Sequence, residues 1–413
     1  MSLSPLPRLT YRPRGPVAGL LDRAALAALQ HALRNFRPVG SLTLTVPDGG
    51  RFRLESGCDG IDAEIDFRNL AIIPKAIRRG TIGFAQAYMD GDLTTPDLVA
   101  VLRFFLHNEA ALGAAGGRLF RVRLPDRLYH LVRPNTRAGA RRNIAAHYDL
   151  SNDFYRLWLD DSMTYSSAYF ADGANDLASA QHAKYRKVIE ALSPQAGDHV
   201  LEIGCGWGGF AEVAAGERDL TVTGITLSRE QLVYARRRIA EAGLAARCDL
   251  RFEDYRDTEG SYDRIASIEM IEAVGEANWP HYFATLAARL RSSGTAAIQA
   301  ITIAEPLFER YRRGVDFIQR YIFPGGMLPT RTVIAREAER AGLALDGVET
   351  FADCYARTLR EWRSRFNAAW PQIAALGFDE RFRRRWDYYL AYCEAGFTER
   401  TIDVGIYRLV KTG

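Results

Sequence analysis

The sequence predicts an α/β protein in which a smaller N-terminal α+β unit precedes a doubly wound, mainly parallel sheet. From about residue 143, short apolar runs alternate with helical patterns, and this β-α-β-α rhythm is typical of parallel sheets. One of these runs leads through a glycine-rich turn into a helix. The chain has 413 residues, and because one domain usually takes about 150 residues, we expect two or three domains.

The composition excludes several classes of protein. Hydrophobic residues at 47% and charged residues at 25% rule out a disordered, collagen-like or coiled-coil protein. No apolar run reaches the roughly 18 residues of a membrane span, and residues 1–14 lack the apolar core of a secretory signal. The five cysteines are odd in number and widely spaced, which argues against a disulfide framework or a metal site. We therefore expect a reduced, cytoplasmic location.

Charge is unevenly distributed along the chain. The net charge of +4 argues against a nucleic-acid-binding protein, but residues 118–142 contain eight arginines against one acid, and residues 381–385 contain a second arginine cluster. A basic residue near an anionic bilayer contributes about 1 kcal/mol, so either cluster could hold the protein on the inner face of the membrane. An ordinary charged surface is the alternative, because only four of the 54 basic residues are lysine and arginine is the usual cation here.

The N-terminal unit is predicted as an accessory domain over 1–117, joined by an arginine-rich linker, 118–142, to the main domain, 143–413. Apolar residues from Leu26 to Phe36 recur at helical spacing, and residues 41–55 alternate around a Pro-Asp-Gly-Gly turn, which predicts a helix and then a hairpin. A second helix is expected to begin with a cap at Thr95. Packing and contact with lipid explain this unit equally well.

The main domain is predicted from its alternating strands and helices. The expected strands are His199–Ile203, Leu220–Ile225, Arg264–Ile268 and Thr295–Ile303, with helices from Gly209, from Arg229 and around His281–Leu290. Ligands of doubly wound sheets bind beyond the carboxyl ends of the strands. We therefore look for the site in the loops after residues 203, 225, 268 and 303.

The glycine-rich turn contains Gly204, Gly206 and Gly209 in a GxGxxG pattern, which alone is a weak sign of a dinucleotide site. A nicotinamide dinucleotide site typically has an acid at the end of the next strand, but that strand ends in Thr-Leu-Ser. Acids instead precede the turn, at Glu202, and follow a later strand, at Asp254. These acids suit a cation with an adenosine part, so the pattern favours S-adenosylmethionine over a nicotinamide.

Five motifs in register then carry a family resemblance. They are HYDLSNDFY at 147–155, MTYSSAYF at 163–170, LEIGCGWGG at 201–209, EAVG at 272–275 and YIFPGGMLP at 321–329. In this order they resemble the cyclopropane-fatty-acyl-phospholipid synthase and mycolic-acid methyltransferase family, from about Asn143 to the C-terminus. The resemblance implies a Rossmann-like methyltransferase sheet, and the N-terminal unit resembles the accessory domain of the phospholipid-acting branch.

The resemblance also implies which residues hold S-adenosylmethionine. They are Tyr165, Ser166, Gly204, Cys205, Gly206, Thr226, Ser228, Gln231, Asp254 and Tyr255. Outside these motifs, the two tyrosines would be interpreted as ordinary core aromatics.

The implied substrate is a cis double bond in an unsaturated phospholipid acyl chain. Methyl transfer to an alkene leaves a carbocation, so the site must be dry, lined by electron-rich rings, and supplied with a base that removes a proton. The resemblance implies that a bound bicarbonate is this base. The groups implied to hold it are Ser167, Glu272, Gln299, the backbone of Ile301, and Tyr355. Cys393 matches a cysteine assigned to the family's active site, but proton removal requires no thiol, so we expect a pocket or packing residue.

Two departures from the family pattern leave the product open. Ser167 stands where the family usually has cysteine, and Gln299 stands where many members have histidine. Both side chains can still hydrogen-bond a small anion, so a cyclopropane chain is the first expectation. The alternatives are a methyl-branched, methylene or methyl-alkene chain, a small natural-product acceptor, or a lipid-binding module without catalysis.

A segment rich in arginines and aromatics, Arg310–Pro324, lies inside a predicted lid insertion at about 305–330. We expect its aromatic faces to line an acyl tunnel and its arginines to face phosphates on an anionic membrane surface. The alternative is a solvated helix packed on the sheet. The sequence leaves a homodimer open.

Overall fold

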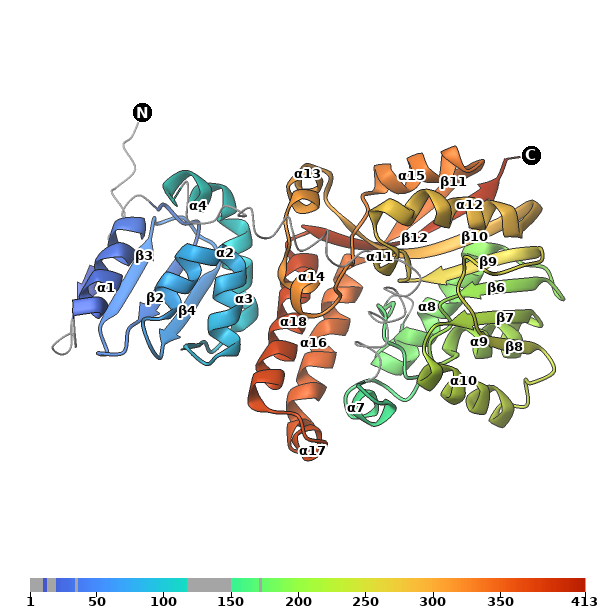
Figure 1. Cartoon of the computed structure of the whole chain (residues 1–413), viewed down its shortest axis with the longest axis horizontal. Coiled ribbons are helices and arrows are strands. Elements are labelled where there is room, and N and C mark those ends of the chain that lie inside the picture. Colours follow the sequence, from blue (N-terminus) through green and yellow to red (C-terminus); the bar gives the residue numbers. More distant parts are fainter. Residues whose placement is uncertain (1–9, 13–19, 34–35, 117–149, 171–172, 413) are drawn as a thin grey trace. The chain divides into compact units, whose positions relative to one another are not determined.

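The computed structural model describes residues 10–12, 20–33, 36–116, 150–170 and 173–412 (Figure 1). The chain divides into two compact units. One unit joins the N-terminal region with Gly314–Phe317 and Gly377–Glu399, and the other contains the rest of the chain. The predicted accessory domain falls in the first unit, which also takes in these two later pieces. The predicted linker, 118–142, lies outside the described residues.

The N-terminal unit contains a five-stranded sheet in the order β1-β3-β2-β4-β5. Its strands are β1 (Thr10–Arg12), β2 (Ser41–Thr45), β3 (Arg51–Glu55), β4 (Asp62–Phe67) and β5 (Leu93–Thr94). β2 and β3 pair antiparallel around the turn, so the predicted hairpin is confirmed. Alternate residues of β3 and β4 are buried, as expected for strands with one face on a core.

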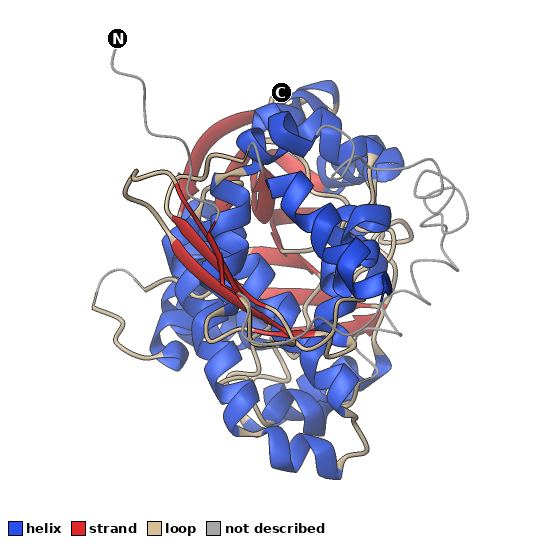
Figure 2. Ribbon diagram, turned by 90° about the vertical axis from the view of Figure 1, so that its left-hand side faces the viewer, coloured by secondary structure: helices blue, strands red, loops and turns tan. Residues whose placement is uncertain are grey.

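In the described part of this unit, five helices accompany the sheet. They are α1 (Leu20–Leu33), α2 (Ile72–Met89), α3 (Leu98–His107), α4 (Glu109–Gly116) and α18 (Glu380–Thr398). The cap of α3 is Asp97, whose side chain accepts a hydrogen bond from the Ala100 amide at 2.9 Å, so the predicted cap at Thr95 is two residues too early. Figure 2 shows the strands of this sheet lying side by side.

The helix α18 comes from the far end of the chain, and polar contacts fix it to α2 and α3. The Tyr88 hydroxyl donates to Asp387 at 2.6 Å, and Arg103 pairs with Glu399 at 2.6 Å. In the second arginine cluster, Arg381 pairs with Asp90 at 3.2 Å. Part of this cluster therefore ties the unit together internally.

The second unit contains a seven-stranded sheet in the order β11-β12-β10-β9-β6-β7-β8. Its strands are β6 (His199–Ile203), β7 (Thr221–Thr226), β8 (Cys248–Phe252), β9 (Tyr262–Ile268), β10 (Leu290–Ile303), β11 (Leu343–Thr350) and β12 (Ile402–Lys411). The pairs from β10 to β8 are parallel, whereas β12 is antiparallel to β10 and β11. The doubly wound sheet is confirmed, but its antiparallel strand β12 and the edge strand β11 beyond it were not predicted.

Helices cover both faces of this sheet, and further helices of the same unit, such as α17, lie away from it (Figure 1). They are α7 (Asn152–Arg156), α8 (Leu177–Leu192), α9 (Gly209–Arg218), α10 (Arg229–Glu241), α11 (Ile271–Val274), the 3₁₀ turn η1 (Glu276–Asn278), α12 (Trp279–Arg289), α13 (Glu305–Arg313), α14 (Phe317–Tyr321), α15 (Arg331–Arg340), α16 (Ala352–Ala368) and α17 (Trp370–Ala375). The predicted helices from Gly209, from Arg229 and around 281–290 are confirmed.

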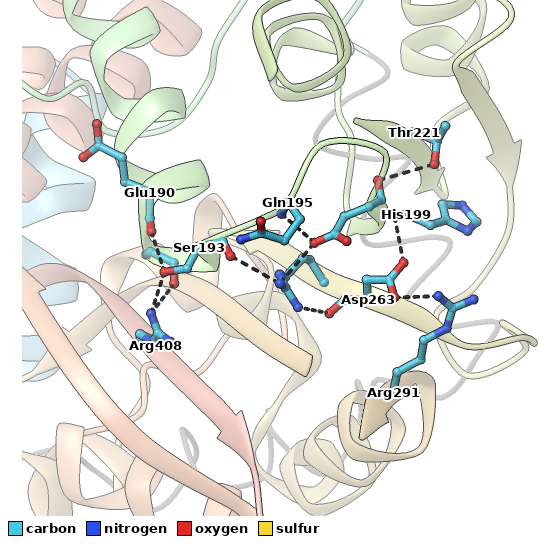
Figure 3. A network of polar contacts seen from close by, with 11 residues as sticks. Glu190, Ser193, Gln195, His199, Thr221, Asp263, Arg291 and Arg408 are labelled. Atoms are coloured by element: carbon cyan, nitrogen blue, oxygen red, sulfur yellow. Dashed lines mark hydrogen bonds and ion pairs between the residues drawn. The ribbon is translucent and has the colours of Figure 1, made fainter. Parts of the chain in front are cut away.

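A polar network closes the amino ends of the parallel strands (Figure 3). The His199 amide, at the start of β6, donates to Asp263 at 3.0 Å, and Arg291 pairs with the other oxygen of Asp263 at 2.5 Å. Arg408 of β12 donates to the Ser193 hydroxyl at 2.8 Å. The charged side chains Asp263, Arg291 and Arg408 at the amino ends of the strands therefore all have partners within the protein.

Candidate active site

A cavity lies at the carboxyl ends of the central strands. It is lined by residues 163–166, 202–207, 225–227 and 268–270, with Lys184, Tyr185, Gly209, Gln231, Glu253, Tyr255 and Ala273. The predicted loops after residues 203, 225 and 268 therefore form it. The loop after residue 303 is not part of its lining.

The glycine-rich turn forms the floor of this cavity and is anchored to β7. The amides of Gly204 and Cys205 both donate to the Ile225 carbonyl, at 3.0 and 2.9 Å. Gly204 has φ of 88°, a conformation that favours glycine. A Cβ at Gly209 would lie 2.5 Å from the Tyr185 hydroxyl, so glycine lets the start of α9 approach that ring.

Eight of the ten residues predicted to hold the methyl donor line the cavity. They are Tyr165, Ser166, Gly204, Cys205, Gly206, Thr226, Gln231 and Tyr255. The other two have structural partners: Ser228 caps α10 and accepts from the Gln231 amide at 3.3 Å, and Asp254 pairs with Arg256 at 2.6 Å. Glu253, one residue before Asp254, lines the cavity instead.

Two buried titratable side chains, Glu202 and Lys184, line this cavity. Burial raises the pKa of Glu202 to about 8, and its Oε2 has no hydrogen-bond partner. Burial lowers the pKa of Lys184, on α8, to about 7, and its ammonium group donates to the Ser166 hydroxyl at 2.6 Å. The free oxygen of Glu202, beside the glycine-rich turn, could accept a hydrogen bond from a hydroxyl group of the methyl donor or attract its positive charge.

Lys184 was not predicted, although the sequence contained a sign of it. It is one of only four lysines, and it occupies a helical position in register with the buried residues Ala180 and Val188. A lysine on the apolar face of a helix is rarely fully buried without a function.

Glu269 is the centre of the buried polar cluster, and the sequence analysis missed it. It follows β9 directly, lines the cavity, and accepts hydrogen bonds from the Ser167 amide at 2.8 Å, the Gln299 side chain at 2.8 Å and the Tyr355 hydroxyl at 2.6 Å. Burial raises the pKa of Glu269, whereas the hydrogen bond from Tyr355 opposes this shift. Its φ of 50° is unusual for a residue with a side chain.

Glu272 lies one turn further on, in α11. Its Oε1 accepts a hydrogen bond from the Ile301 amide at 2.6 Å, and its Oε2 has no partner. Burial and then the negative charge of Glu269 raise the pKa of Glu272 to about 8. Because three donors stabilise the charged form of Glu269 and only one reaches Glu272, we assign the negative charge at neutral pH to Glu269.

The five groups predicted to hold bicarbonate do come together, but they surround protein carboxylates. The donors of Ser167, Gln299 and Tyr355 are all directed at Glu269, and Ile301 donates to Glu272. A separate anion would compete with Glu269 for the same donors and would lie against its negative charge. This donor set therefore does not fit a bound bicarbonate.

Cys393 lies on α18, in the N-terminal unit, and its role stays a prediction.

Aromatic rings surround Tyr165 at the rim of the cavity. Its ring centroid lies 5.4 Å from Tyr155, 5.6 Å from Trp158 and 5.3 Å from Trp362. The faces of such rings attract cations, each contact contributing about 0.5–2 kcal/mol. The wall is therefore suited to a reaction that develops positive charge.

The helix α13 agrees with the packed-helix interpretation of the predicted lid. Phe308 and Tyr311 pack against the core of the sheet, while Arg312 pairs with Glu276 at 2.8 Å and Arg313 with Glu309 at 2.8 Å. A phosphate-binding role for these two arginines stays a prediction.

Among the described residues, no helix is long and apolar enough to cross a membrane, and no group of acidic, histidine or cysteine side chains could hold a metal ion.

Comparison with known proteins shows the relationship of the chain. The family model described as mycolic acid cyclopropane synthetase matches residues 135–406. The chain is 38% identical to the tuberculostearic acid methyltransferase UfaA1 of Mycobacterium tuberculosis, over 98% of this chain and 95% of that protein. It is 35% identical to the cyclopropane-fatty-acyl-phospholipid synthase of Escherichia coli, over 83% of this chain and 86% of that protein.

A solved structure agrees with this relationship. The mycolic acid cyclopropane synthase CmaA1, in complex with SAH and CTAB, superposes with a TM-score of 0.62 at 32% identity, over 66% of this chain and 98% of that protein. The resemblance found in the motifs is thereby confirmed. The chain belongs to the mycolic acid cyclopropane synthetase family and is an S-adenosylmethionine-dependent methyltransferase of the cyclopropane-fatty-acyl-phospholipid synthase type.

Proposed function

We propose that the protein transfers a methyl group from S-adenosylmethionine to the double bond of an unsaturated acyl chain of a phospholipid. The observation that carries this proposal is the carboxylate of Glu269, which lines the cavity beside the glycine-rich turn, with Glu272 three residues further along the chain. An alkene becomes a cation on methylation, and a dry, anionic and aromatic site suits that cation. A polar acceptor would not need such surroundings.

Each part of the cavity has a task in this scheme. The glycine-rich turn and Tyr165, Thr226, Gln231 and Tyr255 bind the donor, which supplies an electrophilic methyl group on a sulfonium ion. The rings around Tyr165 stabilise positive charge, and the buried position excludes water that would trap the cation. Glu269 also lines the cavity, and its negative charge stabilises the cation.

Loss of a proton after methyl transfer decides the product. We propose an open-chain product, a methylene-branched chain, because the relative that matches 98% of this chain is a tuberculostearic acid methyltransferase, and the departures of Gln299 and Ser167 from the usual family pattern leave room for such a product. A saturated branch would need a further reductive step. A cyclopropane chain is the second candidate, favoured by the Escherichia coli relative and by the name of the family.

We further propose that the protein works at an anionic membrane surface, because its substrate chains lie there. The arginine side chains of α13, Arg312 and Arg313, are exposed by 47% and 69% and are the described residues that test this contact. Changing both to glutamine should weaken binding to anionic vesicles, and unchanged binding rejects a phosphate role for α13.

A homodimer is a separate proposal, and size-exclusion chromatography of the full chain tests it.

Mass spectrometry of phospholipid acyl chains tests the main proposal. Expression in a host without such an enzyme should add one CH₂ unit to unsaturated chains. A retained double bond in the heavier chain indicates the methylene product or a methyl-alkene, and a lost double bond indicates the ring. Unmodified chains, together with methylation of a polar acceptor by the purified protein, would reject the lipid assignment.

A further inference from the structure

The strongest unexplained feature of the site is the convergence of three donors on one carboxylate. Ser167, Gln299 and Tyr355 are 102, 30 and 86 residues from Glu269, yet all three direct a hydrogen bond to it. Three long-range donors around one planar carboxylate form a binding site for a small oxyanion. In this chain the oxyanion is a side chain.

The backbone gives a second, independent observation. Glu269 has φ of 50°, in the left-handed region that costs a residue with a Cβ roughly 1 kcal/mol or more. Strained backbone of this kind persists where the surrounding structure determines it, and it is concentrated at functional sites. Glycine would adopt this conformation without strain, so the position holds glutamate despite a local cost.

We propose that Glu269 is the base of this site, supplied by the chain itself in place of a bound bicarbonate. The inference rests on the proposed function for the identity of the proton that is removed. Whether Glu269 occupies the anion site does not depend on that function and can be measured separately.

The step balances without a further reactant. The π electrons of the alkene form the bond to the incoming methyl carbon, while the sulfur keeps the electron pair of the broken bond. A 1,2-hydride shift moves the positive charge to the carbon that carries the new methyl group, and this methyl group then loses a proton to a carboxylate oxygen of Glu269. The electron pair of that C–H bond becomes the double bond of the methylene chain. Without the hydride shift, the electron pair of the methyl C–H bond becomes the third bond of a ring.

Neighbouring groups prepare Glu269 for this role. Tyr355, Gln299 and the Ser167 amide orient both of its oxygens, and the field of buried Lys184 favours its charged form. Glu272, with one oxygen unpartnered, is held mainly protonated and does not compete as a base. Glu272 is therefore a positioning residue, bonded to β10 through Ile301.

The first arm of the test measures the anion site without any lipid substrate. Full-length protein is titrated with ¹³C-bicarbonate and followed by NMR, with the product-side inhibitor S-adenosylhomocysteine present. The wild type should show no bound bicarbonate, whereas Glu269→Gly, which removes the carboxylate and relieves the strained backbone, should bind it. Stoichiometric binding by the wild type would overturn the proposal.

The second arm measures turnover on vesicles of unsaturated phospholipid in buffer freed of carbon dioxide. Wild-type turnover should not depend on added bicarbonate, and Glu269→Gln should lose roughly a hundredfold or more, as expected for a lost general base. Affinity for S-adenosylhomocysteine and the melting temperature should stay near wild-type values. The exposed Glu259→Gln is the matched control and should keep full activity.

The two arms separate the two proposals. If wild-type turnover requires bicarbonate, or if Glu269→Gln keeps its rate, Glu269 is not the base although the lipid function stands. If no unsaturated lipid is methylated by the wild type, the proposed function fails, and the NMR titration still decides whether Glu269 fills the anion site. Bicarbonate-dependent recovery of Glu269→Gly activity would support the base role further.

Discussion

The two ends of the seven-stranded sheet carry charge in opposite surroundings. At the amino ends, Asp263 pairs with Arg291, whose side chain is 54% exposed, and also accepts from the His199 amide (Figure 3). At the carboxyl ends, Glu269 and Glu272 are three residues apart and only partly exposed, burial raises the pKa of both carboxyl groups, and one of their oxygens has no partner.

This difference separates scaffold from function. Exposed ion pairs contribute about 0.2–1 kcal/mol and tolerate change. Buried carboxylates are costly, because desolvation opposes their charge and like charges repel. A sheet that matches its charges at one end and leaves buried carboxylates at the other is organised for chemistry at the second end. The two ends should therefore respond differently to mutation, and four variants test this.

The largest effect is expected at Tyr355. Tyr355→Phe removes the 2.6 Å hydrogen bond to Glu269, and a hydrogen bond to a charged group contributes about 1.5–3 kcal/mol. Turnover on unsaturated phospholipid should fall by roughly 10- to 100-fold. Tyr234→Phe, on α10 outside the cavity, is the control. Equal turnover in both variants would show that the polar cluster is dispensable.

The glycine-rich turn should be nearly as sensitive. In Gly209→Ala the new Cβ would lie 2.5–2.9 Å from buried Tyr185, and such overpacking costs about 1–3 kcal/mol. We expect weaker binding of S-adenosylhomocysteine by calorimetry and a lower melting temperature. Gly216→Ala in the same helix has its nearest neighbour at 3.5 Å and should be neutral or stabilising, because alanine favours helices. Equal donor affinity in the two variants would remove the packing argument.

The buried carboxylates should also set the pH dependence of stability. The pKa of Glu202 is about 8 in the folded protein and near its ordinary value when unfolded, so the folded state holds more protons between about pH 5 and pH 7. The free energy of unfolding should therefore fall as the pH rises through this range, by up to about 1.4 kcal/mol per pH unit for such a group. Lys184, with its pKa lowered to about 7, acts in the opposite direction only above this range.

Chemical denaturation at several pH values measures this effect. Glu202→Gln should flatten the fall in stability, whereas Glu241→Gln, at an exposed site on α10, should leave it unchanged. An unchanged slope in Glu202→Gln would show that Glu202 is ionised in the folded state.

The smallest effect is expected at the amino ends of the strands. Arg291→Gln removes the exposed partner of Asp263 and should cost about 0.2–1 kcal/mol of unfolding free energy, without any change in turnover. Loss of activity in this variant would mean that the two ends of the sheet are coupled.

Local patterns were sufficient to predict much of the fold. The hairpin at residues 41–55, the strand His199–Ile203 and the turn into the helix at Gly209 all depend on residues adjacent in sequence. The strands β11 and β12 were missed, because β12 pairs with β10, about 100 residues away in the sequence, and β11 pairs only with β12. Likewise, nothing local indicates that α18 joins the N-terminal unit.

The site shows the same division. The residues predicted to bind S-adenosylmethionine follow the motifs, and most of them line the cavity, whereas the side chains of Asp254 and Ser228 have partners in the protein. Glu269 carries no signal of its own in the sequence. Its role emerges only when folding brings Ser167 and Tyr355 to it.

The most direct measurement of the whole account uses S-adenosylmethionine with a trideuterated methyl group and vesicles of unsaturated phospholipid in bicarbonate-free buffer. We predict acyl chains that carry the transferred carbon with two or three deuterium atoms, according to which carbon loses its proton, and no such product from Glu269→Gln. Deuterium found only on a polar group, or lipid labelling that stops when bicarbonate is removed, would contradict it.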